Sequence, residues 1–160
     1  MAFSDYSWKY CPDTIINKGA YILFYKCVKI YHGTHVPGPV DKPNAESEYN
    51  AACTAGMALS HFNTLIHEFL NKDPDTVPDE APLILLDTKY AVFMDTNVKD
   101  TKLTRHIYRR VHLVRNGEKF KMNNIDWCEG GLQISEIATK NVGVNDLNTR
   151  IKYIMVRIEN

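Results

Sequence analysis

The sequence lacks the features that mark secreted, membrane-spanning and zinc-binding proteins. No two of its four cysteines, Cys11, Cys27, Cys53 and Cys128, form a CxxC pair. We expect no secretory signal peptide before them. We therefore expect neither disulfides nor a zinc knuckle, and we expect the protein to occupy a reducing compartment. No apolar run approaches the roughly 20 residues that a membrane span needs, so we expect a soluble chain without membrane contact.

The sequence also lacks an excess of charge of either sign. Lys plus Arg and Asp plus Glu each number 19, so the formal net charge is zero. Such a chain does not coat nucleic acid by bulk charge, and any contact with nucleic acid must come from a local patch. Internal repeats and low-complexity tracts are also missing. The length suits a single domain, residues 1–160, with a core that needs no covalent staples.

Strand-forming residues dominate the first quarter of the chain. Residues 2–8 are one strand candidate, and residues 19–36, rich in Tyr, Ile, Val and Phe, predict two strands of an antiparallel meander. Residues 36–44 carry three prolines and cannot be helical. Asn44 then makes a good N-cap for a long helix that we expect to end near Leu70.

Strands and helices alternate in the remainder of the chain. Residues 83–86 (LILL) are wholly apolar, as in a strand buried on both faces, and residues 118–128 also predict a strand. Helices are expected at residues 90–94, 102–115, 132–140 and 145–158. A meander followed by alternation predicts an α/β domain, with a mixed sheet flanked by helices.

Four carboxylates stand at positions that such a sheet can bring together. Asp5 lies inside the first strand, and Asp87 ends the buried strand. Glu48 lies at the head of the long helix, on its otherwise apolar stripe, and Glu136 lies on a short helix near the end. Clustered carboxylates repel one another, and an uncompensated buried charge costs several kcal/mol, so cations are required.

The ligand atoms in this cluster would all be oxygen, which points to Mg²⁺ or Mn²⁺ rather than zinc. Two such ions roughly 4 Å apart would clamp a phosphate, one activating water and the other stabilising the leaving oxygen. Spacing alone leaves a plainer interpretation open. A carboxylate early in a helix is commonly a partner of the helix dipole, and an Asp at a strand end is commonly a turn residue.

Several segments resemble, in the same order, the ribonuclease H domain of copia-type retrotransposon polyproteins, which follows the reverse transcriptase. FSDYSW is similar to the family's Y-S-D-A-D-W opening, and AESEYNAA to its T-E-A-E-Y-x-A helix start. The other matching segments are NKGAYILF, LLDTKYAV, TRHIYRRVHLVRN and LQISEIATKNV. Together the matches cover nearly the whole chain.

The resemblance implies a ribonuclease H-like fold, with a mixed five-stranded sheet flanked by helices. It also implies Mg²⁺-dependent cleavage of the RNA strand of an RNA–DNA hybrid, with Mn²⁺ able to substitute, leaving a 3′-hydroxyl and a 5′-phosphate. It implies that Asp5, Glu48 and Asp87 are the catalytic and metal-binding carboxylates, with Glu136 at the fourth position. Glu48 is chosen over Glu46 because the family's ligand precedes an aromatic residue. The implied partners are the RNA–DNA hybrid and the polymerase region of the parent polyprotein. The implied location is the cytoplasm, the nucleus or a virus-like particle.

The chain departs from the family pattern at several positions. Glu136 replaces an Asp, and IYHGTHV (30–36) replaces the basic strand W-K-S-K-K-Q. Tyr108 replaces the Asp after His-Ile, and Tyr90 replaces the Ser of D-x-x-S-A. These changes support a second hypothesis, a decayed or domesticated nucleic-acid-binding module without turnover. A third hypothesis is a structural domain that binds only protein.

Contacts with the nucleic-acid backbone are expected from a basic helix face, although such a face is also common as a solvated surface. His106 on this face is a candidate for protonating a leaving group, as against a bystander. Trp8 and Trp127 are interpreted as core anchors rather than base-stacking platforms. The expected nucleic-acid-binding residues are Lys102, Arg105, His106, Arg109 and Arg115.

Overall fold

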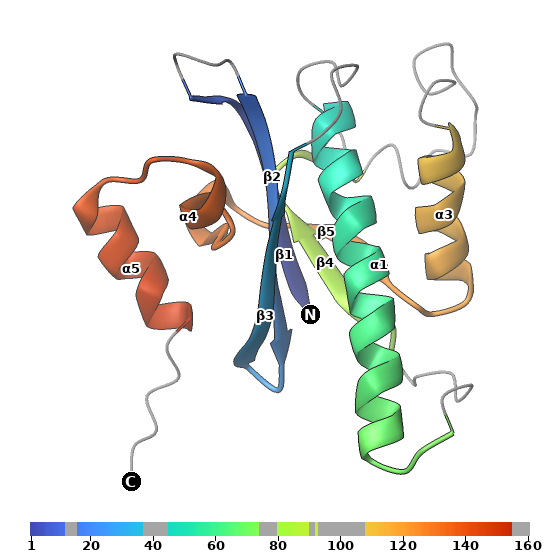
Figure 1. Cartoon of the computed structure of the whole chain (residues 1–160). Coiled ribbons are helices and arrows are strands. Elements are labelled where there is room, and N and C mark those ends of the chain that lie inside the picture. The colour runs from blue at the N-terminus through green and yellow to red at the C-terminus, as the bar shows by residue number, and fades with distance from the viewer. Residues whose placement is uncertain (12–15, 37–44, 74–79, 90–91, 93–107, 155–160) are drawn as a thin grey trace, which may run out of the picture.

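The computed structural model describes residues 1–11, 16–36, 45–73, 80–89, 92 and 108–154 (Figure 1). Five strands form one mixed sheet in the order β3-β2-β1-β4-β5. The first three strands pair antiparallel, whereas β4 pairs parallel to both β1 and β5. The strands are β1 (Ala2–Cys11), β2 (Ile16–Tyr25), β3 (Val28–His35), β4 (Leu83–Leu86) and β5 (Asn124–Trp127). This mixed α/β sheet confirms the predicted fold class and is consistent with a ribonuclease H-like fold.

Helices cover both faces of the sheet. Figure 1 shows α1 and α3 on one side of the strands and α4 and α5 on the other. The helices are α1 (Ala45–Phe69), α3 (Tyr108–Lys119), α4 (Glu136–Thr139) and α5 (Val144–Ile154), with a 3-10 turn η2 (Gly130–Leu132) before α4. None of the described helices is both long and apolar enough to cross a membrane.

The hydrophobic core lies mainly between the sheet and α1. Leu23, Ile84 and Leu86 of the strands pack there against Tyr49 and Leu59 of α1. A smaller apolar cluster occupies the opposite face, because successive residues of a strand point to opposite sides of a sheet. It is formed by Phe3, Ile22, Phe24, Cys128 and Ile134, with Leu85 packed against it.

The C-terminal half differs in detail from the predicted elements. The strand expected at 118–128 is shorter, because α3 continues to Lys119 and β5 begins only at Asn124. The helix ends where Lys121 adopts a positive φ of 55° and the Met122 N–H bonds back to the Gly117 carbonyl. The short helix expected at 132–140 is confined to residues 136–139. The helix expected at 90–94 and the first part of the one expected at 102–115 lie outside the described residues.

The structure describes the side chains of three of the four cysteines. Cys27 is exposed, Cys53 and Cys128 are buried, and all of them are unbridged. Since Cys53 and Cys128 belong to the two separate core clusters on opposite faces of the sheet, they serve as small apolar side chains.

The core assignment predicts unequal effects of the same substitution at two sites on one helix. Leu59 is 6% exposed and Leu65 is 42% exposed, both on α1. Leu59→Ala should lower the free energy of unfolding by about 2–5 kcal/mol, since it removes core contacts and leaves a cavity. Leu65→Ala should change it by well under about 1 kcal/mol. Urea denaturation measures both, and equal losses would contradict the assignment of the core.

Candidate metal centre

Three carboxylates from distant parts of the sequence converge where β4 ends, beside the interior of β1. Asp5, Asp87 and Glu136 each place a carboxylate oxygen within 4.8 Å of the others. The sheet register explains the meeting of the first two. Phe3 pairs with Leu85 in the parallel β1–β4 ladder, so Asp5 and Asp87, each two residues further on, emerge side by side on the same face.

Glu136 reaches this point because the segment before α4 is anchored to both strands. The buried Gln133 side chain donates from Nε2 to the Ser4 carbonyl of β1 at 2.7 Å and to the Leu85 carbonyl of β4 at 3.3 Å. The Ser135 hydroxyl donates to Gln133 Oε1 at 2.9 Å, which completes the bonding of the amide. This amide bridge positions the first turn of α4, where Glu136 lies.

Glu48 lies beside the trio, at the head of α1, and is only 8% exposed. The backbone N–H of Tyr6 donates to its carboxylate, but Oε2 has no hydrogen-bond partner among the described residues. Burial, reinforced by the negative charges of Asp5 and Asp87, raises the pKa of Glu48 to about 9. Without an added cation, this side chain is therefore protonated at neutral pH.

Asp5 is the most deeply buried member of the cluster, at 0% exposure. Burial raises its pKa, and the charges of Asp87 and Glu136 act in the same direction. Lys140 and a hydrogen bond from the Thr139 hydroxyl to Oδ2 oppose this rise. The carboxylate is thus oriented by Thr139 and held at the centre of the group.

Two side-chain cations compensate part of the negative charge. The Lys140 ammonium lies 2.7 Å from Glu136 Oε1 and 3.5 Å from Asp5 Oδ1, and Arg150 Nη2 lies 2.5 Å from Glu136 Oε2. Burial alone lowers the pKa of Lys140, but Asp5 and Glu136 outweigh it, so the net change is upward. If all four carboxylates ionise, Lys140 and Arg150 balance two of them, which leaves the charge that one divalent cation neutralises.

The residues fit a hard divalent cation. Every candidate ligand atom is a carboxylate oxygen, the donor type that Mg²⁺ and Mn²⁺ prefer. The unpartnered Oε2 of buried Glu48 is a second indication, since buried polar atoms normally have partners. The cluster can therefore bind a metal through Asp5, Asp87 and Glu136, with Glu48 alongside.

The expected basic face is only partly described. Lys102, Arg105 and His106 lie outside the described residues, and Arg109 is described only by its backbone in α3. Arg115 lies half-buried on α3, which packs against α1 on the side of the sheet away from α4. Binding of nucleic acid by these residues stays a prediction.

Some residues of the centre were not anticipated from sequence. Lys140 had a local signal, because it follows Glu136 by four residues on a helical segment. Gln133 and Arg150 had none, since their partners are distant in the sequence. Trp127 was wrongly expected in the core: it is 40% exposed, and its Nε1 donates to the Asp87 carbonyl at 2.9 Å. The side chain of Trp8 lies outside the described set.

No protein-family model matches the chain, and no curated protein matches it.

The raised pKa of Glu48 predicts how stability changes with pH in metal-free protein. An acid whose pKa rises on folding takes up a proton, so stability should fall as pH increases from about 4.5 toward 9. The slope from this one group is at most about 1.4 kcal/mol per pH unit. Glu48→Gln should flatten the dependence and make the variant relatively more stable at high pH.

Urea denaturation in EDTA across this range measures the effect. Glu118→Gln, which alters an exposed carboxylate on α3, is the matched control and should run parallel to wild type. A Glu48→Gln curve that also runs parallel to wild type would contradict the protonated state of Glu48.

Proposed function

We propose that this chain is a metal-dependent endonuclease that hydrolyses the RNA strand of RNA–DNA hybrids. The observation that carries the proposal is the convergence of Asp5, Asp87 and Glu136, with buried Glu48 beside them. A small domain gains no stability from such a group without cations, so a role in binding metal and phosphate accounts for it best.

The roles of the individual residues follow from their surroundings. Asp5, Asp87, Glu136 and Glu48 would hold Mg²⁺ or Mn²⁺, which when bound activates water and stabilises charge on a phosphate. Thr139 would keep the Asp5 carboxylate oriented through its hydrogen bond. Such positioning matters because metal chemistry tolerates little displacement of its ligands.

Lys140 would have a second role once the carboxylates are neutralised. Its side chain is 37% exposed and its ammonium contacts the cluster, so a phosphate at the site would meet a positive charge there. Phosphate contacts of this kind supply affinity without reading sequence. Arg150, bonded to the Gln133 carbonyl and to Glu136, would hold α4 in place.

The substrate class comes from the family resemblance and not from the geometry. The acidic segments FSDYSW, AESEYNAA, LLDTKYAV and LQISEIATKNV supply the four clustered carboxylates. These segments resemble, in the same order along the chain, segments of the ribonuclease H domain of copia-type reverse transcriptases. An RNA–DNA hybrid is therefore the proposed substrate, and the polymerase region of the parent polyprotein is the proposed partner.

A catalytically inactive nucleic-acid-binding module is the second candidate, and the ion pairs of Glu136 favour it. Both oxygens of this carboxylate already contact cations, Lys140 on one side and Arg150 on the other. If Glu136 keeps both contacts after a metal ion is added, it cannot serve as the fourth metal ligand, and the rate of cleavage falls. The two candidates thus differ in whether a divalent ion displaces Lys140 from the carboxylates.

Cleavage of a labelled RNA–DNA hybrid tests the main proposal. The purified chain should cut the RNA strand with Mg²⁺ or Mn²⁺ and stop on addition of EDTA. Asp87→Asn should lower the rate by at least about a hundredfold, since it removes a ligand charge from the centre. Glu118→Gln, remote from the cluster, should cut like wild type. Equal residual activity in Asp87→Asn would overturn the assignment, and binding without cleavage in Mn²⁺ would select the second candidate.

Calorimetric titration with Mn²⁺ tests the metal centre apart from activity. Wild type should bind, and a hundredfold excess of metal over its Kd should stabilise the fold by about 2.7 kcal/mol. Asp5→Asn should abolish binding. Lys140→Gln should tighten it by on the order of tenfold or more, because a competing positive charge is removed. Unchanged affinity in Lys140→Gln would show that the ammonium does not compete with metal.

A further inference from the structure

An exposed tryptophan lies immediately beside the acidic cluster. Trp127 ends β5 and is 40% exposed, yet its ring is fixed in orientation. Its Nε1 donates to the Asp87 carbonyl at 2.9 Å, and its own backbone N–H donates to Asp126 Oδ1 at 2.7 Å. A large apolar ring held rigidly at the surface is a common element of binding sites.

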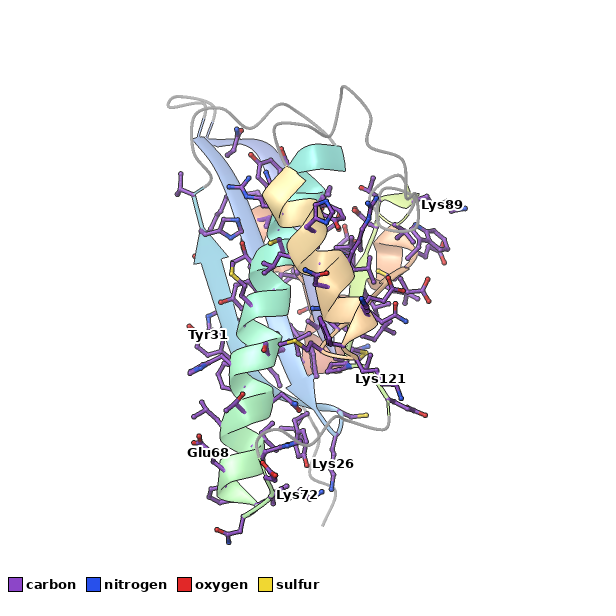
Figure 2. The ribbon with its side chains drawn as sticks, turned by 90° about the vertical axis from the view of Figure 1, so that its right-hand side faces the viewer. Lys26, Tyr31, Glu68, Lys72, Lys89 and Lys121 are labelled. Carbon is purple, nitrogen blue, oxygen red and sulfur yellow. The ribbon has the colours of Figure 1, made fainter. Side chains whose placement is uncertain are left out.

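The ring is partly covered by a flexible cation. Lys89 Nζ lies 4.5 Å from the centroid of the Trp127 ring, and Figure 2 shows Lys89 at the periphery of the molecule. An exposed cation–π contact is weak. Stacking of a nucleobase on an aromatic side chain is stronger, so a base can displace Lys89 from the ring.

We propose that Trp127 and Lys89 form a docking position for one unstacked nucleotide of the substrate. The base stacks on the Trp127 ring, and the Lys89 ammonium moves from the ring to the nucleotide's phosphate. This inference rests on the proposed function only in taking nucleic acid as the substrate.

The docking position selects a particular form of nucleic acid. Bases inside a hybrid duplex are already stacked on both faces, so they cannot lie on the ring without disrupting the duplex. A base in a single-stranded extension is free to stack. The preferred substrate is therefore a hybrid that continues into a single strand, rather than a blunt hybrid.

The position is tied mechanically to the metal centre. Asp87 supplies a carboxylate to the cluster, while its backbone carbonyl anchors the indole of Trp127. A nucleotide held on the ring is thereby kept at a fixed separation from the carboxylates. Trp127 acts as a positioning residue, because it places the strand and does not contact the reacting phosphate.

Binding measurements in EDTA, without turnover, test the proposal directly. The two probes are a blunt RNA–DNA hybrid and the same hybrid with a single-stranded extension, followed by fluorescence anisotropy. Wild type should bind the extended probe more tightly. Trp127→Ala should weaken that binding by roughly 5- to 150-fold, equivalent to about 1–3 kcal/mol per stacked base, and leave the blunt probe nearly unaffected. Lys89→Gln should reduce the salt dependence by about one phosphate contact.

The chain offers a matched control and a second variant. Lys119 lies 5.8 Å from the centroid of exposed Phe120, an equivalent pair at the far end of α3, so Lys119→Gln and Phe120→Ala should not change the preference. Trp127→Phe keeps a stacking ring without the indole N–H and should lose less affinity than Trp127→Ala. In a Trp8→Phe background, Trp127 is the remaining tryptophan, and the extended probe should quench its fluorescence.

The outcomes separate this inference from the proposed hydrolysis. Equal affinity of wild type for the two probes, or an equal loss in Phe120→Ala, overturns the docking position even if the chain cuts hybrids. An extension preference that depends on Trp127, in a chain that never cuts, upholds the docking position and rejects the hydrolysis.

Discussion

Electrostatic repulsion among buried carboxylates is the constraint on which the rest of this structure depends. Asp5 is fully buried, and Asp87, Glu136 and Glu48 surround it. Bringing such groups out of water costs several kcal/mol for each charge unless opposite charge accompanies them. The fold meets this cost with Lys140 and Arg150, and with protonation of Glu48 when no metal is bound. A divalent cation would replace that proton.

Polar bonds, in addition to the apolar packing of Ile134, hold the cluster in place. Gln133 connects the α4 segment to carbonyls of β1 and β4, and Arg150 of α5 bonds back to the Gln133 carbonyl. A bonded amide fixes direction as well as distance, which an apolar contact does not. The carboxylate of Glu136 is thereby placed opposite Asp5 and Asp87, although α4 itself is a single short turn. This arrangement suits a site whose ligands must lie within a fraction of an ångström of a working geometry.

The two proposed functions, a nuclease and a binding module, differ in the outcome of one competition. Lys140 contacts both Asp5 and Glu136, so it occupies the position of a counter-ion. A nuclease needs the divalent ion to outcompete this ammonium, whereas a binding module can retain it. The Glu136 side chain bears on the same balance, because it reaches Lys140 and Arg150 together.

The sequence by itself determined the elements and the candidate ligands. Alternation, proline placement and helical periodicity identified the meander, the long helix α1 and the buried strand β4, because these patterns depend on local geometry and burial. They were less accurate for β5 and α4, where helix-ending geometry at Lys121 and anchoring by Gln133 override local preference. The sequence pointed to Asp5, Asp87 and Glu136, which the structure brings together, and to Glu48 beside them, but it did not give their separations.

Only the tertiary structure decided how those carboxylates are compensated and what lies next to them. The parallel register of β1 and β4 brings Asp5 to Asp87, and long-range bonds place Arg150 on Glu136. Trp127 looked like a core residue from composition, yet the edge position of β5 leaves it at the surface against Asp87. Sequence patterns report which residues prefer to be buried or helical, whereas charge pairing and exposure depend on neighbours that meet only after the sheet has formed.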